Sequence, residues 1–233
     1  MNRILFGLAA SAALFASNAY AAAPCGCKDL PVLVKELTEQ QFLQELFAKW
    51  SVYMPREITT TASLRDHAVQ QFNDAFYGTG AAAGTASGGH AAYGTDLESA
   101  ECPIVQYLYD AKGRPLKNKD GTQKTVPVTE ETVKTKECAS LVNYVFAHER
   151  AHQVTCQNLV KNGKTNLWKS PEFFAADDAK AYQAGIDVLR EELKNLAGKC
   201  GWESSTKNRL PNLDEAKDLA KRAAKTVNSR RRK

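Results

Sequence analysis

The sequence predicts an α+β domain that is stabilised by disulfides. Segments with helical apolar spacing lie on both sides of a shorter region, residues 103–129, which is rich in β-forming residues and turn signals. Six cysteines occur in a chain that begins with the features of an export signal, and an even number of cysteines in an exported chain indicates disulfides. About 210 residues remain after the signal, which is enough for one domain with a hydrophobic core.

The first 21 residues are predicted to be a secretory signal peptide. They combine a positive charge at Arg3, an apolar run over residues 4–16 and small residues, Ala19 and Ala21, before the expected cleavage bond. The apolar run is too short for a good membrane span. We therefore expect cleavage near Ala21 and a protein that is secreted or periplasmic.

An amphipathic helix that packs in the core is expected next over residues 35–50, and a second helix is expected over residues 59–76. A Gly-rich segment, residues 78–94, then reads as a loop. It is either a plain surface loop or a loop that borders a cleft, where glycine lets the backbone approach a substrate. In the second case His90 or Tyr93 would steady an oxyanion on the substrate.

Two strands are expected after this loop. Residues 103–109 are rich in β-formers, and turn signals follow at 110–113 and 119–121. Residues 125–129 form the second expected strand, and Pro127 places it at the edge of a sheet because proline cannot donate a ladder hydrogen bond.

Residues 138–156 are predicted to form a helix that carries two histidines on one face. His148 and His152 are four residues apart, so their imidazoles can point at one zinc ion. Glu149 lies one step around the helix, where it could reach a water on the metal without being a ligand. The ends of this helix, Cys138 and Cys156, would be about 25 Å apart. The two cysteines are therefore expected to pair with different partners, because a disulfide needs its Cα atoms within about 7 Å.

The third zinc ligand is expected from the next helix, which begins with Ser170 as N-cap and ends near residue 197. Asp178 lies on its otherwise apolar face, where a carboxylate needs a cation. Glu172 is the alternative ligand, although an acid in the first turn also suits the helix dipole. The side chain of Asp177 points more towards the side of this helix. Asp177 is expected to hold a ligand histidine through the ring nitrogen that does not bind the metal. Tyr182 lies on the same face as Asp178 and is a further supporting residue.

Two patterns carry a resemblance to a known family. His148-Glu149-Arg150-Ala151-His152 resembles the zinc-binding motif of the zincin metallopeptidases. Asp178-Ala179-Lys180-Ala181-Tyr182 resembles the acidic-x-x-Ala pattern of one zincin subtype, with Asp where Glu is usual. The subtype with a further Gly and a third His is excluded, because Thr155 and Asn158 stand at those positions. The resemblance covers about residues 138–190.

This resemblance implies a zincin-like domain over residues 22–200, in which a small sheet precedes the active-site helix and an edge strand lines the cleft. It implies a zinc metalloendopeptidase that acts on protein or peptide substrates, with Glu149 accepting a proton from the zinc-bound water. Two alternatives stay open: an amide hydrolase for cell-wall peptides, and a binding module that zinc stabilises without any catalysis.

The charge of the chain is unevenly distributed. The net charge is +5, but Arg3 belongs to the expected signal peptide and residues 221–233 contain seven basic residues and no acid, which leaves residues 22–220 with a net charge of −3. This distribution argues against a nucleic-acid groove through the domain. Residues 201–233 are expected to be a basic helical extension that makes weak contact with anionic surfaces.

Overall fold

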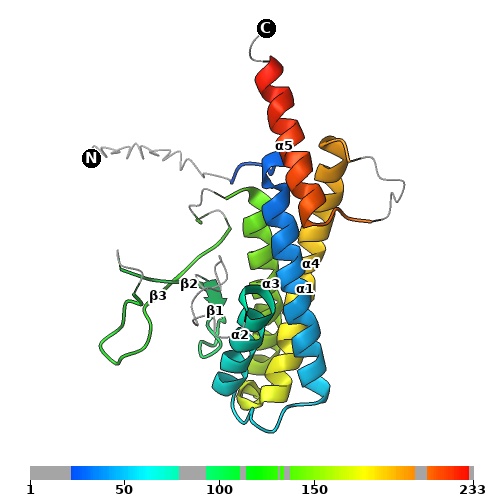
Figure 1. Ribbon diagram of the computed structural model, residues 1–233. Helices are drawn as coiled ribbons and strands as arrows, with labels where there is room; N and C mark the ends of the chain where they lie inside the picture. The colour runs from blue at the N-terminus through cyan, green and yellow to red at the C-terminus, as the bar shows by residue number, and fades with distance from the viewer. Residues whose placement is uncertain are drawn as a thin grey trace, which may run out of the picture.

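Two long helices, α3 (Ala139–Lys161) and α4 (Pro171–Lys199), form the frame of the molecule. The structure is a computed structural model that describes residues 22–78, 93–110, 114–130, 132–133, 137–202 and 209–230. The predicted signal peptide and His90 lie outside these residues. The two helices are antiparallel, because Tyr144 faces Gly185 whereas His152, further along α3, faces Asp178, which is earlier in α4 (Figure 1).

Helix α1 (Leu30–Val52) packs along α4 and buries the main apolar core. It begins five residues before the expected start at residue 35. Pro31 is compatible with the first turn of a helix, and Leu30 and Leu33 are completely buried against Leu189 and Leu193 of α4. Each such side chain stabilises the fold by about 1.5–3 kcal/mol relative to an exposed position, so tertiary packing accounts for the earlier start.

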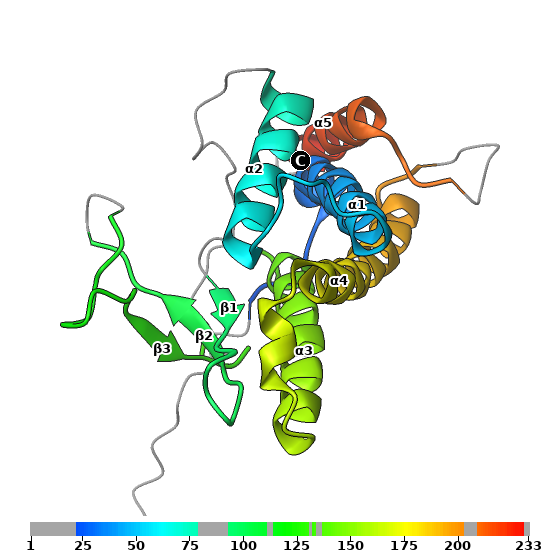
Figure 2. The ribbon, with the colours of Figure 1, turned by 90° about the horizontal axis from the view of Figure 1, so that it is seen from below.

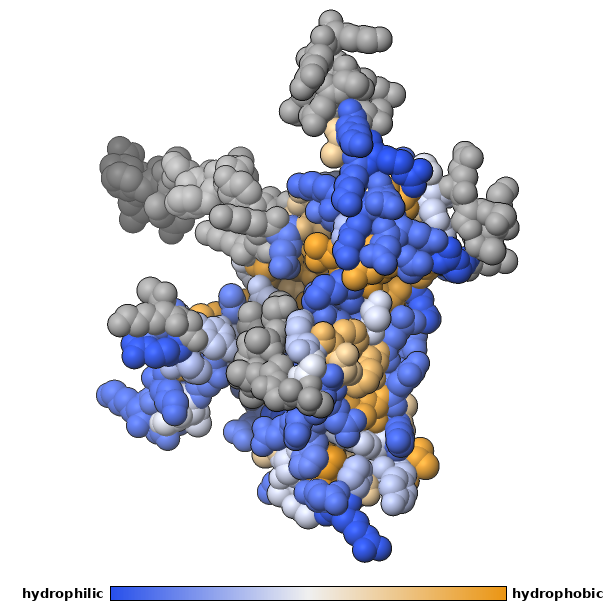
Figure 3. All heavy atoms as spheres, in the orientation of Figure 1, coloured by the Kyte–Doolittle hydropathy of each residue, from blue (hydrophilic) through white to orange (hydrophobic). Residues whose placement is uncertain are grey.

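The C-terminal helix α5 (Leu213–Arg230) packs on α1 (Figure 1). Ala216 and Leu219 are completely buried in the same core as Leu30 and Leu33. The outer side of α5 is hydrophilic in Figure 3, because Lys217, Lys221 and other basic residues are exposed there. No helix in the described part of the chain has the length and hydropathy that a membrane crossing requires.

Helix α2 (Thr61–Tyr77) covers one side of the bundle, close to the predicted 59–76 (Figure 2). Thr60 and Ser63 cap its start: the Thr60 hydroxyl accepts from the Ser63 amide at 3.0 Å, and the Ser63 hydroxyl accepts from the Thr60 amide at 3.0 Å. Such a reciprocal cap satisfies amide groups that have no partner inside the helix. Phe72 then packs on Phe42 of α1, with 6.3 Å between the ring centroids.

A three-stranded antiparallel sheet completes the α+β fold, in the order β1-β2-β3. Strands β2 (Ile104–Tyr107) and β3 (Thr125–Pro127) lie within the two predicted segments, and Pro127 is on an edge strand as expected. Strand β1 (Tyr93–Thr95) corrects the prediction of a loop up to residue 94. Its three residues pair with Ile104–Gln106, and Tyr93 packs on Phe146 of α3, with 5.8 Å between the ring centroids. These long-range contacts, rather than local propensity, define the strand.

Three disulfides connect the elements: Cys25–Cys138, Cys27–Cys200 and Cys102–Cys156. The prediction that Cys138 and Cys156 have different partners is confirmed, because they lie at opposite parts of the α3 segment. Two of the bonds anchor the N-terminal segment to the start of α3 and the end of α4. The third holds the start of β2 against α3. Three disulfides indicate an oxidising compartment.

Candidate metal centre

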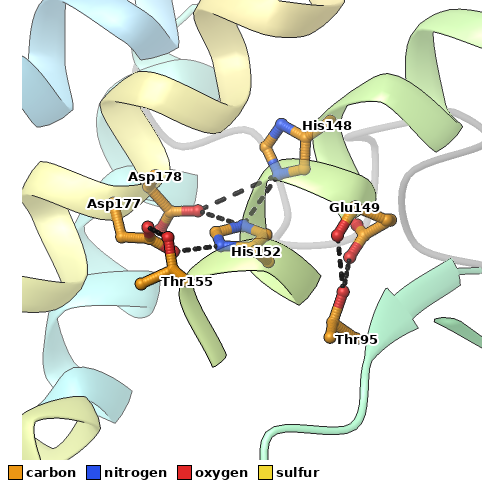
Figure 4. Close-up of polar contacts among 7 residues, drawn as sticks. All are labelled: Thr95, His148, Glu149, His152, Thr155, Asp177 and Asp178. Carbon is orange, nitrogen blue, oxygen red and sulfur yellow. Dashed lines mark hydrogen bonds and ion pairs between the residues drawn. The ribbon is translucent and has the colours of Figure 1, made fainter. Parts of the chain in front are cut away.

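The candidate metal centre lies where α3 and α4 face each other (Figure 4). The four-residue spacing brings the Nε2 atoms of His148 and His152 to 3.2 Å from each other. From α4, Oδ1 of Asp178 lies 3.1 Å from the His152 Nε2 atom and 3.9 Å from the His148 Nε2 atom. All three side chains are buried, and their ligand atoms form a group that could hold a metal ion.

The three distances fit a metal ion. Ligand atoms around a tetrahedral zinc, with bonds of about 2.0–2.1 Å, lie about 3.3 Å apart. The observed separations of 3.1, 3.2 and 3.9 Å therefore need only small movements of the side chains to surround the ion. Two imidazoles and one carboxylate are also a common set of protein ligands for a catalytic zinc.

Close packing of the two helices brings Asp178 to the histidines. A Cβ atom at Gly185 would lie 3.2 Å from the carbonyl oxygen of Tyr144, so glycine permits the short approach of α4 to α3. Glu172, the alternative ligand, is instead exposed in the first turn of α4. Its carboxylate accepts a hydrogen bond from the Ser170 hydroxyl at 2.7 Å, and this bond lowers its pKa. The structure thus places Asp178, not Glu172, with His148 and His152.

Asp177 lies behind His152, on the side away from the three ligand atoms. Its Oδ2 accepts a hydrogen bond from Nδ1 of His152 at 2.5 Å, and its Oδ1 accepts one from the Thr155 hydroxyl at 2.6 Å (Figure 4). A proton on Nδ1 leaves Nε2 as the atom that can bind a metal. This is the arrangement that the sequence predicted for Asp177.

The buried charges of the centre favour a bound cation. Burial lowers the pKa of His152, but hydrogen bonds with Asp177 and Asp178 outweigh that effect and raise the pKa to about 10. The carboxylates of Glu149, Asp177 and Asp178 are each less than 8 % exposed and lie close to the two imidazoles, and the charge of Arg65 also acts on Glu149. A divalent ion would supply the positive charge that such a group requires.

Glu149 is beside the three ligands but is not one of them. One of its carboxylate oxygens, Oε2, lies 2.9 Å from the hydroxyl of Thr95 in β1, and this hydroxyl is also 3.0 Å from the Glu149 carbonyl oxygen. Burial raises the pKa of the Glu149 carboxyl, whereas the charge of His152 and the hydrogen bond from Thr95 oppose the rise. A buried carboxylate with a raised pKa is suited to accept a proton near neutral pH.

A cavity of about 430 Å³ opens beside these residues. This size is within the usual range for binding sites of small molecules. Helices α1 and α2 contribute apolar side chains to its wall, β1 contributes its three residues, and α3 and α4 contribute the metal centre. Strand β1 is an edge strand of the sheet, and it lines the cavity.

The other predicted supporting residues have different positions. Tyr182 is packed between His148, at 4.5 Å between ring centroids, and Phe47, at 5.6 Å, and burial raises its pKa well above the usual value. It therefore holds the His148 ring in place and also lines the cavity. Tyr93 lines the cavity from β1. His90 lies outside the described residues, and its expected role stays a prediction.

Polar residues that line the cavity without having been predicted from the sequence include Thr95, Tyr107 and Arg65. Tyr107 crosses β1 at Gly94, where a Cβ atom would lie 2.6 Å from the Tyr107 hydroxyl oxygen. A glycine in a strand often marks such a close approach, and Gly94 was the only local signal. Thr95 and Arg65 had no local signal, because each reaches the site through contacts between distant segments.

The chain has no match among protein-family models, curated proteins or solved structures. Any functional conclusion therefore depends on the residues of the site.

Proposed function

We propose that this protein is a zinc-dependent hydrolase that cleaves peptide bonds in an oxidising compartment outside the cytoplasm. The observation that carries the proposal is the position of Glu149. Its buried carboxylate is next to the three potential ligands, is not among them, and faces the same cavity. This is the placement of a general base in metal-assisted hydrolysis.

His148, His152 and Asp178 would hold the zinc ion. When bound, zinc lowers the pKa of a coordinated water and polarises a carbonyl group. Thr95 holds Oε2 of Glu149, which leaves Oε1 to accept a proton. Tyr93 and Tyr107 place phenol groups along the same cavity, where a hydroxyl could donate to the oxygen of the scissile carbonyl. Edge strand β1 offers its backbone to an extended peptide.

A binding module with a purely structural zinc is less well supported. Such a site needs its ligands and the residues that orient them, but it has no use for Glu149, a buried acid that is not among the ligands. Burying the carboxylate of Glu149 costs free energy, and this cost is understandable if the group accepts a proton during the reaction. An amide hydrolase for cell-wall peptides would use the same residues, and a substrate screen distinguishes it from a general endopeptidase.

The test uses purified protein spanning residues 22–233. Metal analysis comes first, since two histidines and a carboxylate also suit iron(II). Hydrolysis of casein and of cell-wall peptides is then measured with and without a chelator and after zinc is restored. We expect about one zinc per chain and activity that disappears with the chelator and returns with zinc.

Glu149→Gln should keep zinc and lower kcat by about 100-fold or more, because it removes the base but no ligand. His152→Ala should lose both zinc and activity. Glu191→Gln, an exposed acid of α4, is the matched control and should retain both. Full activity in Glu149→Gln, or a zinc-loaded protein that hydrolyses neither substrate class, would overturn the proposal.

A further inference from the structure

Arg65 lines the cavity of the metal centre from α2. The carbon of its guanidinium group lies 4.7 Å from the centroid of the Phe174 ring. The Phe174 ring in turn stacks on His152, with 6.3 Å between the centroids and 26° between the planes. The stacking therefore holds the positive charge of Arg65 close to the metal ligands, on a helix that does not provide any of them.

The guanidinium group has its hydrogen-bond donors available. Among the residues that the structure describes, Arg65 makes no ion pair with a carboxylate. The guanidinium carbon lies over the Phe174 ring, and the N–H donors of a guanidinium group lie in its plane and point outward from its edge. A planar fork of donors matches the two oxygens of a carboxylate.

The charged side chains of the cavity wall differ in sign between its two ends. Glu36 lies at one end, where its carboxylate accepts a hydrogen bond from the Tyr144 hydroxyl at 2.8 Å, whereas the carboxylate of Glu39 is ion-paired with Lys35 at 2.6 Å. Tyr144 is one helical turn before His148, whereas Phe174, on which Arg65 stacks, is beside His152. The metal centre thus lies between Glu36 on one side and Arg65 on the other. A negatively charged group on a ligand is repelled at the first and attracted at the second.

We propose that Arg65 binds a carboxylate of the substrate, so that the site prefers peptides with a carboxylate close to the bond that is cleaved. This inference rests on the proposed hydrolase function. The carboxylate is either the free C-terminus of a peptide or the side chain of an Asp or Glu residue, since both present the same two oxygens. Arg65 is then a specificity-determining residue, and the carboxylate directs one end of the peptide towards α2.

The alternative role for Arg65 is that of a simple counter-ion. Burial raises the pKa of Glu149, and the charge of Arg65 is one of the effects that oppose the rise. A counter-ion acts on the base and therefore changes the rate for every substrate by the same factor. A carboxylate-binding residue changes the rate only for substrates that carry the carboxylate. The ratio of rates for matched substrates separates the two roles.

The experiment uses four blocked tripeptides in two matched pairs. Acetyl-Ala-Phe-Ala is compared as free acid and as amide, which tests the α-carboxylate. Acetyl-Ala-Phe-Glu-amide is compared with acetyl-Ala-Phe-Gln-amide, which tests the side-chain carboxylate. For each peptide, kcat/KM is measured with the zinc-loaded wild type and with the variants Arg65→Ala, Arg65→Lys and Arg56→Ala. Arg56 is an exposed arginine outside the cavity and is the control.

We expect the wild type to prefer the acidic member of at least one pair by about tenfold or more, which corresponds to about 1.4 kcal/mol. Arg65→Ala should remove this preference, so that the ratio of kcat/KM for the acidic and the neutral member of the pair falls to about one. Arg65→Lys should keep only part of it, because it retains the charge without the planar fork. The pair that shows the preference identifies the source of the carboxylate.

Binding of the same peptides to the zinc-loaded Glu149→Gln variant, with and without Arg65→Ala, gives a readout that does not need hydrolysis. If binding depends on both Arg65 and the carboxylate but the wild type cleaves nothing, the hydrolase proposal fails and the role of Arg65 stands. If neither pair is distinguished by the wild type in cleavage or binding, the Arg65 proposal fails. It also fails if Arg65→Ala slows all four peptides equally.

Discussion

Asp177 and His152 share a hydrogen bond of 2.5 Å between buried side chains on two different helices. The second oxygen of Asp177 is occupied by the Thr155 hydroxyl, so the carboxylate has a defined orientation. This hydrogen bond holds Nδ1 of His152 towards Asp177, so that Nε2 is the nitrogen that faces Asp178 and the cavity. It links the packing of α3 and α4 directly to the chemistry of the site.

Asp177→Asn should weaken zinc binding about 10- to 100-fold while the fold is retained. An amide has one oxygen instead of two, so either His152 or Thr155 loses its acceptor. Competition with a chromogenic chelator measures the affinity. Asp187→Asn is the control, because Asp187 is an exposed residue of α4 that lies away from the centre. Unchanged zinc affinity in Asp177→Asn would show that the bond does not support a metal ligand.

Thr95→Val should move the acidic limb of the kcat/KM profile to higher pH. The Thr95 hydroxyl donates to the ionised form of Glu149 and lowers its pKa, in opposition to burial, so removing the hydroxyl lets the pKa rise. A base with a higher pKa loses its proton only at higher pH. The profile should return towards that of the wild type in Thr95→Ser, which restores the hydroxyl. A lower rate with an unchanged profile would mean that Thr95 is only structural.

Gly185→Ala and Gly198→Ala should have opposite effects on the stability of α4. Both replacements favour the helix by about 0.5–1 kcal/mol. At Gly198 the new Cβ meets nothing within 4 Å, so the gain remains. At Gly185 it lies 3.2 Å from the Tyr144 carbonyl oxygen, and overpacking of this kind costs about 1–3 kcal/mol.

Urea unfolding measures the two changes. We expect Gly198→Ala to raise the midpoint and Gly185→Ala to lower it. Zinc affinity should fall only in Gly185→Ala, because only this change pushes Asp178 away from the histidines. Equal effects of the two variants would contradict the idea that Gly185 sets the approach of α4 to α3.

Removal of the Cys102–Cys156 disulfide by a double Cys→Ala replacement should lower the free energy of unfolding by about 4 kcal/mol, the chain-entropy value for a sequence separation of 54 residues. Zinc should still bind, because the three ligands are on α3 and α4 and this disulfide joins α3 to the start of β2. Denaturant unfolding and metal analysis check the two parts. Loss of zinc from a folded variant would show that the sheet is required to shape the centre.

Local patterns predicted the α+β class and much of the site. Apolar residues that recur every three to four positions predicted helices over the segments that became α1, α2, α3 and α4. The same helical geometry placed His148 and His152 on one face. The side-chain directions on a helix depend on nearby residues only. For the same reason the sequence indicated Asp177 as a support for a histidine and separated Cys138 from Cys156.

Tertiary structure decided the features that depend on distant segments. The choice of Asp178 over Glu172 follows from the close approach of two helices at Gly185, and the cysteine pairing follows from the path of the whole chain. Thr95 reaches Glu149 across 54 residues of sequence, and Arg65 reaches the cavity from α2. The regular spacing of residue types along a segment does not encode such contacts, because burial and packing between elements determine them only once the chain has folded.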